Sequence, residues 1–332
     1  MNRQIVVTHL PEGALGSEHF ELQDVARPVP GPGEALLRVI VMSIDAANRS
    51  WLQGATYRDA VKAGDAMPTY AICEVVESQS PRLSAGDLVA AEAVWADHVV
   101  RPAHKLQKLP KVQPLTHLLS VYGIAGKTAF HGLMQIGQPL AGETIVVSAA
   151  AGSVGGYVGQ IGKALGCRVV GIAGGPEKCA HVTGELGFDA CVDYRAGGVF
   201  KALRAACPEG VDVYFDNVGG GILEATLNLM NERGRVVCCG AISQYDTTTP
   251  TGPRNLPGVV VVKRLRMEGF IVMDFARDDA KAQRALQTWV ASGQIKVTED
   301  VMDGLESAPA ALIGLLAGDN TGKRMVRVGP DP

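Results

Sequence analysis

The sequence lacks the long apolar runs and the one-sided charge that mark several classes of protein. Its amino-terminal apolar run, residues 5–7, is far too short for the core of a signal peptide. The uncharged stretch 144–162 holds five glycines, which favours a turn leading into a helix over a membrane span. The net charge of −3 indicates no basic face for nucleic acid. We therefore expect a soluble, cytoplasmic protein with neither a membrane nor a nucleic acid as partner.

The cysteines and histidines lack the spacing that metal sites require. Seven cysteines form an odd set without a C-x-x-C pair, and seven histidines show neither H-E-x-x-H nor H-x-x-x-H. Reduced thiols in a cytosolic protein explain the cysteines best. The sequence therefore predicts no metal site.

Glycine is abundant, and the pattern of apolar runs changes along the chain. Glycine supplies 40 of 332 residues, about 12% against a typical value near 7%, and the length suffices for two domains. Before residue 110, short runs at 35–41, 72–76 and 88–91 lie between turn signals and predict a small β barrel or sandwich. After residue 120, strand-like and helical segments alternate, which predicts a doubly wound parallel sheet.

The alternation can be stated as ranges. The predicted strands are 144–148, 168–172, 190–193, 211–215, 235–239, 266–272 and 323–328. The predicted helices are 154–165, 177–186, 200–206, 222–230 and 279–292.

The strongest chemical signal follows the first strand of the alternating region. There the sequence reads A-x-x-G-x-x-G, from Ala149 through Gly152 to Gly155. Gly152 allows the backbone to approach a pyrophosphate, which the amino terminus of the next helix favours, and Gly155 allows close packing of helix on strand. The position between a strand and a helix indicates a dinucleotide site rather than a purely structural turn.

The end of the second strand favours NADP over NAD. An NAD site usually has a carboxylate there for the ribose 2′-hydroxyl, whereas this chain has Ala173-Gly174-Gly175 and then Lys178. A lysine suits a 2′-phosphate, although a solvated helix lysine is the simpler alternative. Glu177 is interpreted as a first-turn helix residue that the helix dipole stabilises.

Taken together, these segments resemble the zinc-independent medium-chain dehydrogenase/reductases. The resemblance lies in residues 148–155 (SAAAGSVG), 171–179 (GIAGGPEKC), 214–220 (YFDNVGG), 239–245 (CGAISQY) and 268–272 (EGFIV). The similar branch contains leukotriene B4 12-hydroxydehydrogenase/prostaglandin reductase and the NADPH-dependent double-bond reductases. It implies an α/β fold, with a GroES-like β domain at 1–124 and 299–332 and a Rossmann domain at 125–298. It also implies a homodimer and a small-molecule substrate.

The resemblance implies a role for individual residues. Gly152, Ser153, Val154 and Gly155 would meet the pyrophosphate, Lys178 the 2′-phosphate, Tyr194 the adenosine and Asn217 a ribose. The nicotinamide half would be lined by Cys239, Gly240, Ala241, Ile242, Ser243, Gln244, Tyr245, Phe270, Ile271 and Val272, and Asn320 would close over the cofactor. The zinc-dependent relatives carry a Gly-His-Glu motif, where this chain has Ile72-Cys73-Glu74.

The implied reaction is reduction of the C=C bond of an α,β-unsaturated ketone or aldehyde, with hydride to the β-carbon and a proton to the α-carbon. Tyr245 is the candidate donor to the enolate oxygen, with packing as its alternative. Arg49 and Tyr57 are substrate candidates, for which a solvated loop is the simpler interpretation. The family's Asp-Pro-x-Met-Arg is Asp-Ala-Ala-Asn-Arg here, so the substrate side departs from the pattern. A quinone or carbonyl reductase, or a non-catalytic NADPH-binding protein, stays open.

Overall fold

The computed structural model describes residues 1–332, which divide into two compact units. Unit 1 comprises residues 1–119 and 299–332, and unit 2 comprises residues 120–298. The predicted boundary at 124 lies five residues beyond this division, and the second boundary, between 298 and 299, coincides with it. No helix in the structure combines the length and apolar character needed to cross a bilayer.

Unit 1 is built mainly of β-strands. β1 and β2 form a two-stranded antiparallel sheet, and a second sheet has the order β14-β15-β3-β4-β5-β7, with β6 paired to β3. The strands are β1 (Asn2–Val7), β2 (Phe20–Val25), β3 (Glu34–Ser43), β4 (Pro68–Ser78), β5 (Leu88–Val94), β6 (His98–Pro102), β7 (Gln107–Lys108), β14 (Glu299–Asp303) and β15 (Lys323–Arg327). Two helices, α1 (Ala47–Ser50) and α9 (Ala308–Ala317), complete the unit. Trp51 and Trp95 are buried in it.

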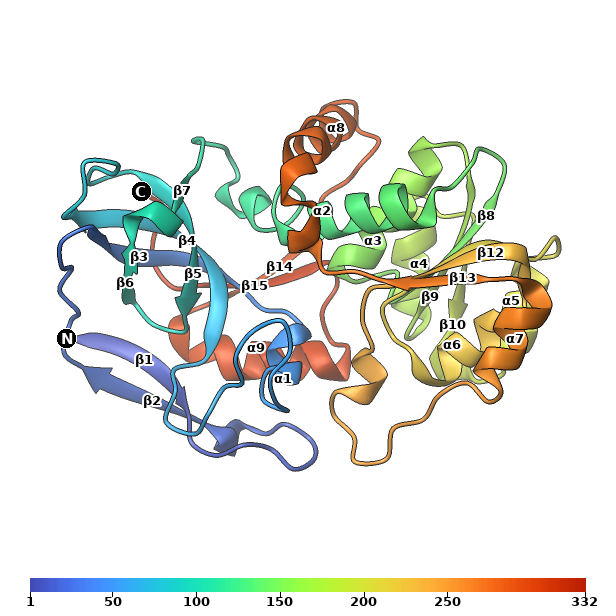
Figure 1. Ribbon diagram of the computed structural model, residues 1–332, viewed down its shortest axis with the longest axis horizontal. Helices are drawn as coiled ribbons and strands as arrows, with labels where there is room; N and C mark the ends of the chain where they lie inside the picture. Colours follow the sequence, from blue (N-terminus) through green and yellow to red (C-terminus); the bar gives the residue numbers. More distant parts are fainter. The chain divides into compact units, whose positions relative to one another are not determined.

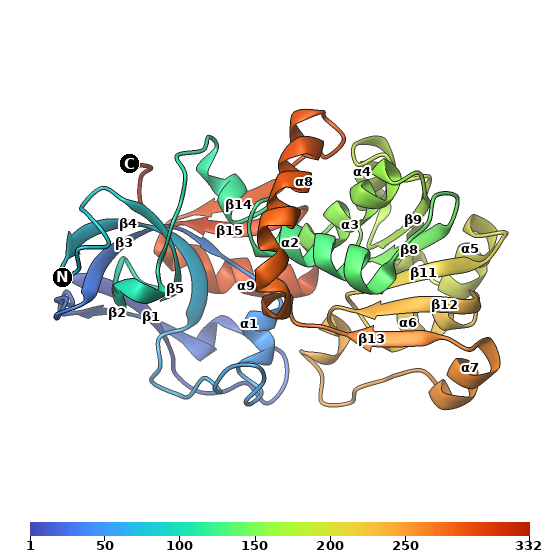
Figure 2. The ribbon, with the colours of Figure 1, turned by 45° about the horizontal axis from the view of Figure 1, so that its top comes forward.

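Unit 2 contains one six-stranded sheet in the order β10-β9-β8-β11-β12-β13 (Figures 1 and 2). Every pair in it is parallel. The strands are β8 (Thr144–Ser148), β9 (Arg168–Ala173), β10 (Ala190–Asp193), β11 (Val211–Asp216), β12 (Met230–Cys238) and β13 (Arg266–Gly269). The predicted α/β fold class, a β domain with a doubly wound parallel sheet, is confirmed.

Helices cover both faces of this sheet and form two separate apolar cores. Residues of α2, α3, α4 and α8 pack on one face, and residues of α5, α6 and α7 pack on the other. The helices are α2 (Ile124–His131), α3 (Ser153–Ala164), α4 (Pro176–Gly184), α5 (Val199–Ala206), α6 (Gly220–Leu227), α7 (Leu256–Lys263) and α8 (Asp279–Ala291). Gly162 allows α3 to pack closely against β8, because a Cβ at this position would lie 2.8 Å from Cδ1 of Ile145.

Three predicted boundaries are wrong because the sequence pattern hides a change of element. The strand predicted at 266–272 ends at Gly269, and a 3-10 helix begins at Val272. The helix predicted at 222–230 ends at Leu227, because Met230 already opens β12, five residues before the predicted start at Arg235.

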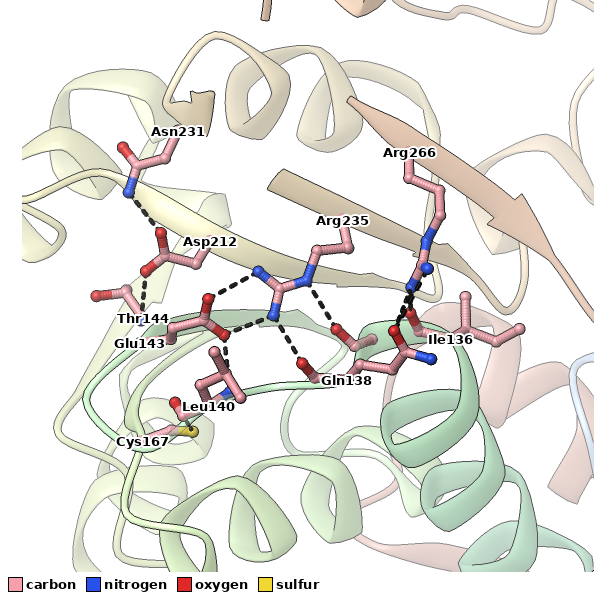
Figure 3. Close-up of polar contacts among 11 residues, drawn as sticks. Ile136, Gln138, Leu140, Glu143, Thr144, Cys167, Asp212, Asn231, Arg235 and Arg266 are labelled. Carbon is pink, nitrogen blue, oxygen red and sulfur yellow. Dashed lines mark hydrogen bonds and ion pairs between the residues drawn. The ribbon is translucent and has the colours of Figure 1, made fainter. Parts of the chain in front are cut away.

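The amino ends of the central strands are joined by a polar network, shown in Figure 3. Arg235 of β12 donates to both carboxylate oxygens of Glu143 (2.8 and 2.5 Å) and to the carbonyls of Gly137 and Gln138 (2.9 and 2.8 Å). Asp212 of β11 accepts from the amide of Thr144 at 2.8 Å. The network therefore fixes three neighbouring strands at the edge of the sheet where they begin.

Candidate dinucleotide and active site

The predicted cofactor residues of unit 2 all follow the carboxyl ends of its strands, so the sheet brings their segments to one edge. They are Gly152–Gly155 after β8, Lys178 after β9, Tyr194 after β10, Asn217 after β11, Cys239–Tyr245 after β12 and Phe270–Val272 after β13. This edge lies opposite the Arg235 network.

The β8–α3 turn has the geometry of a phosphate-binding turn. Ala149 takes a left-handed conformation with φ 50°, which is uncommon for a residue with a side chain. A Cβ on Gly155 would lie 2.3 Å from the carbonyl oxygen of Ala149, and one on Gly152 would lie 3.1 Å from it. Only glycine fits at Gly155, so α3 begins directly against the turn and directs its first amides, from Ser153 onward, at the space beyond the strand.

The β9–α4 turn is covered by side chains from the end of β10. A Cβ on Gly174 would lie 2.9 Å from Cε1 of Tyr194 and 3.0 Å from Nε of Arg195. A larger residue at this position would therefore displace one or both of these side chains. Arg195 is a cation that sequence reasoning missed, because its place depends on how the β10 end folds back over this turn.

Asp193 joins the β9–α4 turn to the segment that follows β10. Its Oδ1 accepts from the amide of Gly175 at 2.8 Å and from the amide of Arg195 at 2.9 Å. These amides, that of Gly175 first, hold the pKa of the Asp193 carboxyl below its usual range. Lys178 follows in the first turn of α4, where it is half-buried. The turn thus has a lysine and an arginine beside it, and the Asp193 carboxylate is engaged by backbone amides, whereas Glu177 in the first turn of α4 is exposed.

A buried carboxylate shapes the turn that carries Asn217. Oδ1 of Asp216 accepts from the hydroxyl of Tyr214 at 2.8 Å and from the amide of Gly219 at 2.9 Å. Burial raises the pKa of Asp216, and these donors partly offset the rise. The hydroxyl oxygen of Ser148 accepts from the amide of Asn217 at 2.9 Å, and the Asn217 side chain donates to the Ser148 carbonyl at 2.8 Å. The ends of β8 and β11 are joined in this way.

Tyr245 closes a short turn after β12. Its hydroxyl oxygen accepts from the amide of Ala241 at 3.1 Å, and an oxygen that accepts a hydrogen bond keeps its own proton to donate. Burial raises the pKa of the phenol, which keeps it protonated at neutral pH. A Cβ on Gly240 would lie 3.3 Å from the Asn217 carbonyl oxygen, so this turn and the Asn217 turn approach closely.

The ring of Phe270 belongs to the core of unit 2. It packs edge-on against Phe215 with ring centres 6.5 Å apart, and a Cβ on Gly132 would lie 2.6 Å from its Cζ. The Phe270 ring is therefore engaged in packing, and a contact of 270–272 with the cofactor stays a prediction.

The two substrate candidates lie in unit 1 and differ in exposure. Arg49 is 2% exposed and donates to the Gly13 carbonyl at 2.7 Å, so the solvated-loop interpretation is wrong for it. The acceptor, Gly13, lies in the segment between β1 and β2, and the aliphatic stem of an arginine lets its donor reach such a carbonyl. Tyr57 is 48% exposed and accepts from Nε1 of Trp51 at 3.3 Å, as a loop residue does.

Asn320 also lies in unit 1, where it is buried. Its side-chain amide donates to the Gly322 carbonyl at 2.9 Å and so stabilises the turn before β15. A contact of Arg49, Tyr57 or Asn320 with substrate or cofactor stays a prediction.

The residues at the carboxyl edge of unit 2 fit an NADP molecule. A turn that admits only glycine suits a pyrophosphate, and two cations beside a glycine turn suit a 2′-phosphate. No three His, Cys, Asp or Glu side chains gather in an arrangement that could hold a metal ion.

Comparison with known proteins places the chain in a family. Residues 3–109 match the model of the N-terminal domain of oxidoreductase, and residues 153–289 match that of zinc-binding dehydrogenase. The chain is 42% identical to the NADPH-dependent curcumin reductase of Escherichia coli K12, covering 99% of this chain and 98% of that one. It is 40% identical to prostaglandin reductase 1 of Rattus norvegicus, covering 95% and 96%.

A solved structure agrees with these matches. CurA of Vibrio vulnificus in complex with NADPH superposes with a TM-score of 0.95 at 38% identity, covering 99% of this chain and all of that one. The resemblance seen in the sequence is confirmed, and the chain belongs to the zinc-independent branch of the medium-chain dehydrogenase/reductase family.

Proposed function

We propose that this protein reduces the C=C bond of α,β-unsaturated ketones or aldehydes with NADPH. The observation that carries the proposal is the gathering, at one edge of the unit 2 sheet, of a glycine-only turn, a turn flanked by Lys178 and Arg195, and the half-buried phenol of Tyr245. Relatives named as NADPH-dependent curcumin reductase and 2-alkenal reductase support the same activity.

Each group at this edge has a distinct task in the proposed reaction. The amides at the start of α3 bind the pyrophosphate, and Lys178 with Arg195 binds the 2′-phosphate. NADPH, when bound, supplies the hydride that the β-carbon of the substrate receives. As electrons move onto the carbonyl oxygen, the Tyr245 hydroxyl donates a hydrogen bond to it. The raised pKa of Tyr245 keeps that proton in place at neutral pH until the negative charge develops.

The test of the reaction class is the oxidation of NADPH and of NADH, followed with an enone, its saturated ketone and a quinone. We expect rapid oxidation of NADPH with the enone, a saturated product and little activity with NADH. Activity confined to the quinone or the saturated ketone would make the protein a quinone or carbonyl reductase. Binding of NADPH without turnover of any substrate would leave a non-catalytic NADPH-binding protein.

Replacement of one hydroxyl tests the role of Tyr245. Tyr245→Phe is expected to lower kcat for the enone about 100-fold and to leave the Kd of NADPH within about twofold, because the donor acts on charge that develops during reaction. The matched control is Tyr157→Phe, which removes a phenol from a buried position on α3. A Tyr245→Phe enzyme with full turnover would assign the oxyanion donor to another group.

We also propose that the protein is a cytoplasmic homodimer whose two copies pair through β13. β13 is an edge strand, and the exposed Val261 and Val262 precede it on α7. A twofold axis at Met267 would pair Arg266 of each copy with Glu268 of the other, which is favourable across antiparallel strands. Sedimentation should give twice the chain mass of 34.8 kDa.

The cytoplasmic location is supported by the cysteines: seven free thiols without a disulfide suit a reducing compartment.

A further inference from the structure

Two cysteines of unit 2 face each other across the interface between α4 and the sheet. Cys191 of β10 is in register with Gly171 of β9, so both positions point to the same face of the sheet. A Cβ on Gly171 would lie 2.9 Å from Cγ1 of Val182, which identifies this face as the one that α4 covers. Cys179 lies three residues before Val182 on α4, on the same side of the helix. Both cysteines pack against the same apolar core on this face of the sheet, and both side chains are half-buried.

This thiol pair lies directly beneath the β9–α4 turn. The amide of Cys179 donates to the carbonyl of Gly175 at 3.2 Å, which is the first hydrogen bond of α4. Cys191 lies two residues before Asp193, whose carboxylate accepts from the amide of Gly175 at 2.8 Å. Cys179 is thus bonded to the turn through its own amide, and Cys191 is connected to it through Asp193, two residues further along β10. Cys179 is also the immediate neighbour of Lys178.

We propose that Cys179 and Cys191 form a redox-sensitive pair whose disulfide weakens the binding of NADPH. A covalent S–S bond of about 2.05 Å is shorter than a hydrogen bond between thiols, so closing it draws the first turn of α4 toward β10. That movement displaces Lys178 and the Gly174–Gly175 turn from the positions in which they meet a 2′-phosphate. The disulfide itself depends only on the placement of the two cysteines between α4 and the sheet, whereas its effect on NADPH rests on the function proposed above.

The oxidant is a low-molecular-weight organic disulfide such as oxidised glutathione. The Cys179 thiolate attacks one of its sulfurs and releases one glutathione thiolate, which takes up the proton that Cys179 has lost. The Cys191 sulfur, on losing its proton, then attacks Sγ of Cys179 and releases the second glutathione. Both cysteines are oxidised, and one glutathione disulfide is reduced to two thiols. Burial, and then its contact with Cys179, raises the pKa of the Cys191 thiol, which makes Cys179 the first to react.

The other five cysteines are placed differently. Cys73, Cys167 and Cys207 are buried. Cys238 and Cys239 are consecutive, but they pack into the cores on opposite faces of the sheet, so their side chains point apart. Burial raises the pKa of Cys238 to about 11, which makes it a half-buried thiol of low reactivity and a suitable control.

The disulfide is tested on the full-length protein treated with oxidised glutathione. We expect two of the seven thiols to be lost, a mass decrease of two hydrogen atoms, and a proteolytic fragment that joins Cys179 to Cys191. Cys191→Ala should accumulate a glutathione adduct on Cys179, Cys179→Ala should carry none on Cys191, and Cys238→Ala should behave as wild type. Seven intact thiols, or a disulfide at any other pair, would overturn the proposal.

The effect on the cofactor is measured by fluorescence titration of NADPH and NADH on reduced and oxidised protein. Loss of one charge-assisted contact to the 2′-phosphate predicts a Kd for NADPH roughly tenfold higher after oxidation, with the Kd for NADH changed less. Dithiothreitol should restore the original value, and Cys179→Ala should show no change on oxidation. An unchanged Kd for NADPH in protein shown to hold the disulfide would overturn the coupling. Reduced protein that fails to bind NADPH would overturn the proposed function but leave the thiol mapping valid.

Discussion

The two edges of the parallel sheet in unit 2 are built from opposite kinds of residue. At the edge where the strands begin, Arg235 pairs with Glu143, and Asp212 accepts hydrogen bonds from the amide of Thr144 and the side chain of Asn231 (Figure 3). At the edge where the strands end, glycines and small polar residues bring backbone turns close together and leave amides directed outward. At the first edge, charged side chains bond one another or neighbouring groups of the chain, whereas at the second the function proposed above assigns the first amides of α3 and the side chains of Lys178, Arg195 and Tyr245 to a ligand. Stability and function are therefore separated within one sheet.

The largest expected effect is on stability, from the loss of Arg235. Arg235→Met leaves the largely buried carboxylate of Glu143 without its partner and two carbonyls without a donor. Breaking a buried pair in this way is expected to lower the free energy of unfolding by about 3 kcal/mol. The measurement is urea denaturation, with Arg233→Met as the control, because Arg233 lies in the same strand and is exposed.

The same variant tests whether the two edges are independent. Folded Arg235→Met protein should bind NADPH with a Kd within about twofold of wild type, since distant sites without shared partners are usually additive. A much weaker affinity in the folded variant would show that the network at one edge positions the turns at the other.

How much the sequence could predict also differs between the edges. Runs such as 144–148 and 190–193 predict β8 and β10 to the residue, because apolar strands between turn signals are a local pattern. The glycine turn before α3 is equally local. The helix α9 was missed, because the apolar residues of 308–317 have no helical periodicity. Arg195 and the Arg235 network were missed as well, because their partners are distant in the chain and only the tertiary fold brings them together.

The second prediction concerns the edge that keeps groups for a ligand. Lys178→Ala is expected to raise the Kd of NADPH about tenfold to a hundredfold, because it removes a charge-assisted contact to the 2′-phosphate. The Kd of NADH and the free energy of unfolding should stay close to those of wild type, since Lys178 is only half-buried, in the first turn of α4. Lys201→Ala, an exposed lysine of α5, is the control. Equal losses for NADPH and NADH would assign Lys178 to another part of the cofactor.

The smallest expected effect is a pH dependence at the network edge. Burial alone would raise the pKa of Glu143, but the hydrogen bonds from Arg235 and from the amide of Leu140 outweigh it and lower the pKa below the ordinary value of 4.5. Because the folded pKa is depressed, Glu143 contributes stability that is fully present above about pH 4.5 and is lost as the pH falls through the folded value. The difference in the free energy of unfolding between wild type and Arg235→Met should therefore be smaller at pH 4 than at pH 7, by less than about 2 kcal/mol. Glu143→Gln removes the titrating group and should show a smaller decline than wild type over the same range. If the difference between wild type and Arg235→Met stays constant with pH, the hydrogen bonds from Arg235 to the two carbonyls, rather than its ion pair, stabilise this edge of the sheet.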